Sequence, residues 1–139
     1  MKALLDSSVL VPAFLADHPH HAASLDLLLR FGKAQTCCAA HSLAEFYATL
    51  TRLPGKERMT GEHAMLFLAE VRQYVTPVVL DEEEYYSAME RASVLGVRGG
   101  TIYDALLANC ALKAKAETLF TWNIKHFQQF TFIAQVRTP

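Results

Sequence analysis

The chain has 139 residues, of which 52% are hydrophobic and 19% are charged, and its formal net charge at pH 7 is −1. This length fits one domain with one continuous core, and the apolar composition argues against a disordered chain. The near-neutral charge argues against a protein whose whole surface attracts nucleic acid, so such a ligand would require a local basic patch or metal ions. We expect a single domain over residues 1–139.

The expected elements alternate along the chain between short apolar runs and helical patterns. The runs that predict strands, bounded by turn residues, are residues 3–5, 36–39, 77–80, 119–121 and 132–134. The segments that predict helices, with apolar residues every three or four positions, are residues 9–14, 20–30, 42–51, 60–75, 81–95 and 101–116.

Short strands alternating with helices of ten or more residues predict βα units. The fold class is therefore α/β: a three-layer α/β/α domain with a short, mostly parallel sheet of four to five strands, covered on both faces. Pro77 lacks an N–H group, which predicts that its strand starts there or lies at a sheet edge. The helix that begins with the acidic run is expected to turn four side chains toward the core: Tyr85, Met89, Ala92 and Leu95.

The three cysteines do not follow the pattern of a disulfide framework or a zinc site. Cys37 and Cys38 are adjacent and Cys110 makes the count odd, all in apolar surroundings. They are expected to be buried thiols in a reducing compartment. The N-terminus does not have the pattern of a signal peptide, and no apolar run approaches the roughly 20 residues that cross a bilayer. We expect a soluble, cytoplasmic protein without a membrane partner.

Polar residues follow several of the expected strands. Ligands of an open parallel sheet bind beyond the carboxyl ends of its strands. Asp6 follows the first strand directly, Glu45 lies in the first turn of the helix after the second strand, and Asn123 follows the strand over residues 119–121. These three residues therefore belong to one edge of the sheet. Asp104 begins a helix that follows another helix, so sheet logic alone does not place it with the others.

Each of these residues, taken singly, also has a purely structural interpretation. Ser42-x-x-Glu45 and Thr101-x-x-Asp104 match the capping box, in which a hydroxyl and a carboxylate bind free N–H groups at a helix start. The acid after the first strand and the amide after the fourth are common caps and turn formers. At this level both interpretations stay open.

The surroundings of the acids favour a shared metal ion. The acids lie in the apolar segments ALLD, AEFYATL and IYDALLA, where neighbouring, partly desolvated carboxylates carry an electrostatic penalty. A hard divalent cation removes this penalty, and three carboxylates with one amide suit Mg²⁺ or Mn²⁺. The set includes no ligating histidine, cysteine nucleophile or glycine-rich phosphate loop, which fits metal-assisted phosphodiester hydrolysis.

Four segments, LLDSSVLV, SLAEFYATLTR, GGTIYDALLA and LFTWNIKHF, carry a family resemblance. In this order they resemble the PIN-domain nucleases, and among them the VapC-like ribonuclease toxins of toxin–antitoxin pairs. The resemblance implies a Mg²⁺- or Mn²⁺-dependent RNase site whose central acids are Asp6, Glu45 and Asp104. The fourth acidic position of the family falls at Asn123, which brings no charge. One metal ion or two therefore remain as alternatives.

Further residues receive supporting roles in this hypothesis. The hydroxyls of Ser7, Thr101 and Thr121 would orient waters or the metal, although Ser7 and Thr121 can equally cap helices. Three basic residues in the loop after the Glu45 helix would hold RNA phosphates, or else form an ordinary solvated loop: Arg52, Lys56 and Arg58.

Aromatic and histidine side chains near the acids also have two interpretations. Trp122 and Tyr103 flank site residues and either stack on a base or fill the core. The histidines at positions 18, 20 and 21 lack a distant partner pair, so a helix start is favoured over a zinc site. His126 is expected at the surface.

Two other functions compete with a nuclease. A receiver domain or a haloacid-dehalogenase-like phosphatase also places an Asp after an early strand. The receiver needs a further acidic pair, and the phosphatase needs an Asp where this chain has Ser8. The second competitor is a non-catalytic PIN-like binding module with a degenerate metal site, for which Asn123 is the best argument.

The expected partners follow from the resemblance alone. VapC-like proteins cut RNA, commonly form homodimers, and are blocked by a small antitoxin whose C-terminal segment lies in a groove near the acids. We therefore expect an RNA substrate, a small antitoxin protein and a homodimer.

Overall fold

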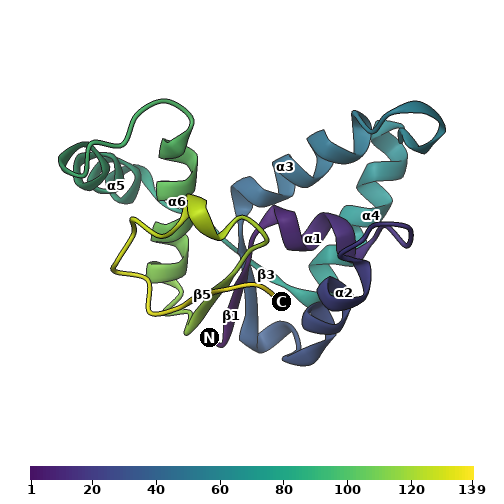
Figure 1. Cartoon of the computed structure of the whole chain (residues 1–139), viewed down its shortest axis with the longest axis horizontal. Coiled ribbons are helices and arrows are strands. Elements are labelled where there is room, and N and C mark those ends of the chain that lie inside the picture. Colours follow the sequence, from purple (N-terminus) through teal and green to yellow (C-terminus); the bar gives the residue numbers. More distant parts are fainter.

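The computed structural model describes residues 1–139 and alternates strands with helices (Figure 1). The strands are β1 (Ala3–Leu5), β2 (Thr36–Ala39), β3 (Thr76–Val78), β4 (Thr118–Phe120) and β5 (Val136–Arg137). The α-helices are α1 (Ser7–Ala13), α2 (His21–Arg30), α3 (Ala40–Thr51), α4 (Gly61–Tyr74), α5 (Glu82–Val94) and α6 (Thr101–Lys113). Three short 3₁₀ helices lie between these elements: η1 (Lys33–Gln35), η2 (Gly55–Glu57) and η3 (Ile124–His126).

The five strands form one parallel sheet in the order β3-β2-β1-β4-β5. The central strand β1 pairs on both sides, with Ala3 opposite Thr36 of β2 and Thr118 of β4. β3 is an edge strand, as Pro77 predicts. Because all strands run the same way, their carboxyl ends meet at one edge of the sheet.

Side-chain alternation along β1 divides the core into two layers. Ala3 and Leu5 are buried in a cluster with residues of α1, α2, α3 and α4. Leu4 points to the opposite face and is buried in a cluster with residues of α5, α6 and β4. Figure 1 shows α5 and α6 on one side of the sheet and α1 to α4 on the other. The predicted three-layer α/β/α architecture is confirmed.

The prediction of which α5 side chains face the core is largely wrong. Tyr85, Met89 and Leu95 are 40%, 43% and 50% exposed, whereas Ala92 and Ala88 are buried. Small side chains let α5 pack closely on α6, so the larger apolar side chains lie outside. Hydrophobic spacing alone could not distinguish these two faces.

The last strand also differs from its prediction over residues 132–134. Phe132 and Ile133 lie in a turn, in which the Ile133 N–H group donates to the Phe130 carbonyl. The ladder with β4 begins only where the Leu119 N–H group donates to the Gln135 carbonyl, at 2.8 Å. Phe132 and Ile133 are apolar because they pack on the core from this turn.

The three cysteines are free and buried, as expected. Burial raises the pKa of Cys37 and of Cys38 to about 12, so both thiols stay protonated at neutral pH. No helix combines the length and apolarity that a membrane crossing requires.

Removing the ring of Phe46 should destabilise the domain strongly. Phe46 of α3 is fully buried and meets Phe14 edge to face, with ring centroids 5.8 Å apart. We expect Phe46→Ala to lower the free energy of unfolding by about 3–5 kcal/mol in urea titrations, because it leaves a cavity. Leu66→Ala, at a position that is 68% exposed, is the control, and should change it by less than about 0.5 kcal/mol. Equal effects would contradict the assigned core.

Candidate functional site

An open cleft of about 600 Å³ lies at the carboxyl edge of the sheet. Six of the residues selected from the sequence line it: Asp6, Ser7, Glu45, Thr101, Asp104 and Asn123. The structure thus brings Asp104 to the acids that sheet logic had grouped, because α6 begins at this same edge. His41, Tyr103, Lys125 and His126 line the cleft as well.

Asp6 caps a helix and also lines the cleft. It ends β1, where its N–H group donates to the Phe120 carbonyl of β4 at 3.0 Å. Its Oδ1 accepts the Ser7 N–H group at 2.8 Å, which caps α1. Its Oδ2 accepts the hydroxyls of Ser8 and Thr121, each at 2.8 Å. Oδ1 has one hydrogen bond and keeps a lone pair for another ligand.

The capping-box interpretation of Glu45 is wrong. α3 begins at Ala40, its N-cap is Ala39, and no side chain caps it. Ser42 therefore lies inside the helix, with its buried Oγ making no hydrogen bond. Glu45 is free of a capping role and lies near His41 on the next turn back, with Oε1 3.9 Å from Nε2.

Asp104 is likewise not part of a capping box. The N-cap of α6 is Gly100, and no side chain makes a capping hydrogen bond there. Thr101 is the first residue of the helix and lines the cleft. The Asp104 carboxylate lies near His126, with Oδ2 3.8 Å from Nδ1.

The carboxylates influence one another electrostatically. Burial raises the pKa of Glu45; His41 acts in the opposite direction, and the charges of Asp6 and Asp104 raise it further. Burial likewise raises the pKa of Asp104, against the effect of His126 and with that of Asp6. The cleft is therefore a place where negative charge is costly and a cation would be stabilised.

Asn123 lines the cleft, whereas Thr121 is buried beneath it. The Asn123 side chain makes no capping hydrogen bond to η3 and lines the cleft. Its N–H group donates to Thr121 Oγ1 at 2.9 Å. Thr121 is fully buried beneath the cleft and binds Asp6. Thr121 therefore positions Asp6 and does not line the open space.

Sequence reasoning missed Ser8 and His41. Ser8 Oγ holds Asp6 and also accepts the Trp122 N–H group at 3.0 Å, which ties the end of β1 to the segment after β4. No local pattern indicates this bond. His41 was detectable, because residues four apart on a helix are neighbours and Glu45 follows His41 at that spacing.

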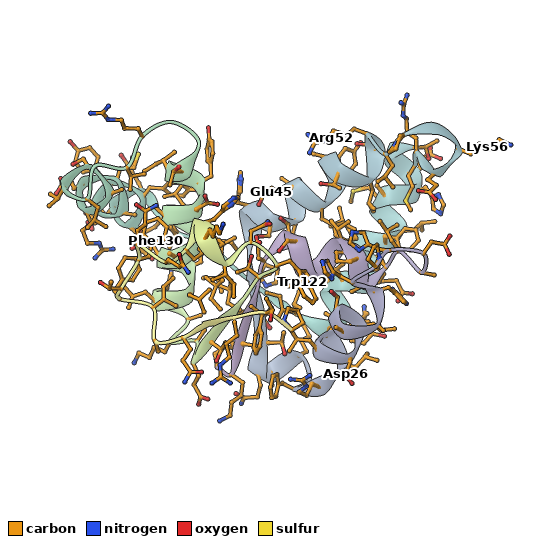
Figure 2. The ribbon with its side chains drawn as sticks, viewed as in Figure 1. Asp26, Glu45, Arg52, Lys56, Trp122 and Phe130 are labelled. Carbon is orange, nitrogen blue, oxygen red and sulfur yellow. The ribbon has the colours of Figure 1, made fainter.

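The three basic residues lie outside the cleft lining. In Figure 2, Glu45, Arg52 and Lys56 follow one another outward along α3 and its following turn. Arg52 is the C-cap of α3, two helical turns or about 10 Å beyond Glu45. The Arg58 guanidinium donates to the Leu53 carbonyl at 3.1 Å. None of the three cations therefore belongs to the lining of the cleft.

Trp122 has a structural role, whereas Tyr103 does not. The Trp122 indole donates to buried Ser24 at 3.0 Å, and its ring stacks on His20 with centroids 3.7 Å apart. Tyr103 is 55% exposed at the cleft.

The histidines lie at the positions that the sequence predicts, and one of them, His126, also lines the cleft. His20 is the N-cap of α2, and His21 Nδ1 lies 2.8 Å from the Pro12 carbonyl, so both belong to a helix start. His126 is exposed, as expected, but it also lines the cleft.

The donors of the cleft fit a hard divalent cation. In this structure no three His, Cys, Asp or Glu side chains are close enough together to hold an ion. The available groups are nevertheless carboxylate and amide oxygens, which Mg²⁺ and Mn²⁺ prefer. Burial, together with the charge of Asp6, raises the pKa of Glu45 and of Asp104, and a bound cation would stabilise their ionised forms.

Comparison with known proteins identifies the family. A family model for the PIN domain matches residues 3–132. This chain belongs to the PIN-domain family. Ribonuclease VapC27 from Mycobacterium tuberculosis is 30% identical over 113 residues, which cover 81% of this chain and 79% of that protein.

Solved structures share the same fold. The sarcin-ricin loop cleaving toxin VapC20 from Mycobacterium tuberculosis is similar with a TM-score of 0.71 at 15% identity, covering 94% of this PIN domain and 95% of that chain. VapBC2 from Rickettsia felis, bound to a DNA fragment from its promoter, is similar with a TM-score of 0.68 at 19% identity, covering 99% and 98%.

Neutralising Glu45 should remove a pH-dependent loss of stability. Because its pKa is raised in the folded state, the folded chain binds this proton more tightly than the unfolded chain. Stability is therefore lost as pH rises from about 4 through the folded-state pKa. We expect Glu45→Gln to raise the melting temperature slightly at pH 7 with chelator, and not below about pH 4.

The control for this change is Glu90→Gln, at an exposed position on α5 away from the cleft. Its melting temperature should follow that of the wild type over the same pH range. A Glu45→Gln protein that melts lower than the wild type at pH 7 would contradict the assigned repulsion.

Proposed function

We propose that this PIN domain is a Mg²⁺- or Mn²⁺-dependent endoribonuclease, and that it is the toxin of a VapBC-type toxin–antitoxin pair. One observation carries the proposal: Asp6, Glu45 and Asp104 line one cleft, and neither Glu45 nor Asp104 is used as a helix cap. The similarity to ribonuclease VapC27 supports RNA as the substrate.

The carboxylates of Asp6, Glu45 and Asp104 and the amide oxygen of Asn123 would hold the metal. A bound divalent cation supplies Lewis acidity toward a phosphate and makes water a competent nucleophile at neutral pH. Ser8 and Thr121 fix Asp6 by saturating Oδ2, which leaves Oδ1 as its free ligand atom.

The remaining cleft residues would handle water and substrate. The hydroxyls of Ser7 and Thr101, with the Asn123 amide, line the cleft and would orient waters by hydrogen bonds. Lys125 lies in the same lining and offers positive charge to a phosphate oxygen.

The basic residues beyond the cleft would guide the RNA backbone. Arg52 lies two helical turns from Glu45, and Lys56 extends the same direction (Figure 2). Together with Arg58 they supply cations within reach of successive phosphates, an interaction that weakens with added salt.

The proposed protein partner is a small antitoxin. Its support is the similarity of the whole fold to VapBC2. An antitoxin would inhibit the enzyme by covering the cleft or displacing its metal. The same class of proteins commonly forms homodimers, and we include a homodimer in the proposal.

A non-catalytic binding module is the second candidate. It is favoured by Asn123, because an uncharged amide at the fourth position weakens the attraction for a second cation. The two candidates differ in one respect: RNA cleavage by a nuclease requires the metal and the acids, whereas a binding module does not cleave RNA at all.

Cleavage of a structured RNA should require a divalent metal and all three acids. We expect purified protein to cut the RNA with Mg²⁺ or Mn²⁺ but not with excess chelator, as read on sequencing gels. Asp6→Asn, Glu45→Gln and Asp104→Asn should each lower the rate by at least about 100-fold, while the variants stay folded by circular dichroism. Glu90→Gln is the matched control. Folded wild-type protein that binds RNA without cutting it would favour the binding module.

Restoring an acid at position 123 should strengthen metal binding. Asn123→Asp adds a fourth carboxylate to the cleft lining, so Mn²⁺ should bind more tightly in calorimetric titrations, by about tenfold. The added charge should also lower the melting temperature when metal is absent, because it increases repulsion. Unchanged affinity would show that position 123 does not contact the ion.

A further inference from the structure

We propose that His41 and Tyr103 form an aromatic platform at the cleft, on which an unpaired nucleobase of the substrate stacks beside the cleaved phosphate. This inference rests on the proposed ribonuclease function and names a binding subsite and a substrate feature for it. Here "aromatic platform" means these two side chains.

The two rings are parallel and come from helices on opposite faces of the sheet. His41 lies in the first turn of α3, and Tyr103 lies in the first turn of α6. Their ring planes differ by 6°, with centroids 5.5 Å apart. This is an offset stack, the arrangement that parallel aromatic rings prefer, and each ring helps to hold the plane of the other.

The platform is not required by the core. Tyr103 is 55% exposed, and neither side chain belongs to the two hydrophobic clusters or their partly buried neighbours. Trp122 provides the contrast, because its ring is covered by His20 and its N–H group is bound by Ser24. An exposed aromatic pair in a polar cleft is a surface suited to a ligand with its own π face.

The platform lies next to the acids. His41 Nε2 is 3.9 Å from Glu45, and Tyr103 directly precedes Asp104. A base stacked there belongs to a nucleotide that flanks the phosphate held at the carboxylates. Arg52 lies two turns further along α3, where the next phosphates of the same strand would pass.

The geometry selects for a base outside a duplex. A paired base has both faces covered by its neighbours, so it cannot stack on a protein ring without leaving the helix. Stacking tolerates any base but strengthens with the size of the π surface, so a modest preference for purines follows. We therefore infer cleavage next to an unpaired purine, in a loop or single strand.

Fluorescence of 2-aminopurine tests the platform directly, because stacking quenches its emission. Single-stranded RNA oligonucleotides with 2-aminopurine at successive positions are mixed with the wild type in Mg²⁺ by stopped flow. Emission is read before cleavage, and products are run on gels from the same mixture. We expect quenching at one position adjacent to the cut site.

Variants then assign the quenching to the platform. Tyr103→Ala should abolish it and weaken oligonucleotide binding by about tenfold, whereas Tyr103→Phe should preserve both. Tyr86→Ala is the matched control, because Tyr86 is 65% exposed on α5, outside the cleft. Melting temperatures identify any variant that fails to fold, and the Tyr103→Phe result then decides.

Three outcomes would overturn the platform: no quenching by the wild type at any position, equal quenching by Tyr103→Ala, or loss of quenching in Tyr86→Ala as well. Failure of the proposed function looks different, because RNA would then stay intact in Mg²⁺ whether or not the base is quenched. If the wild type cuts the RNA without quenching at any position, and Tyr103→Ala cuts it at the same rate, the platform alone is refuted.

Discussion

The parallel pairing of β1 with β2 and β4 is the constraint on which the site depends. The pairing buries β1 completely and stops at Asp6, whose N–H group still bonds to β4. β2 ends beside it, where α3 begins, and the segment after β4 brings Thr121 and Asn123 to the same edge. No helix could place these groups together unless the strands ended in register.

Asp6 caps a helix and also lines the cleft. It caps α1 through Oδ1, and through Oδ2 it joins Ser8 and Thr121, which are far apart in the chain. This network fixes the carboxylate before any ligand arrives. Burying acids near one another opposes folding, as the raised pKa values of Glu45 and Asp104 indicate. The two apolar layers on either side of β1 supply the stability that tolerates this repulsion.

The fold was predictable because its signals are local. Residues 3–5 are apolar throughout and residues 36–39 are apolar after Thr36, and such short runs are typical of strands buried on both faces. The predictions were wrong where the same apolar pattern is compatible with two different local structures. In α5, small residues rather than large ones face α6, and in the segment after Phe130 the apolar residues pack from a turn. Periodicity records apolar character but not the partner against which it is buried.

For the site, the sequence by itself determined that Asp6, Glu45 and Asn123 lie at one edge of the sheet, because a residue's position after a parallel strand fixes its edge. It left capping boxes at Ser42 and Thr101 open as an alternative, and the structure does not form them. For Asp104 only the family resemblance implied a place beside these acids, and the tertiary structure brings it to the same cleft. That Ser8 binds Asp6 and that His41 meets Tyr103 was decided by the tertiary structure alone. These contacts join elements from opposite sheet faces or distant segments, and their geometry depends on packing that no local pattern encodes.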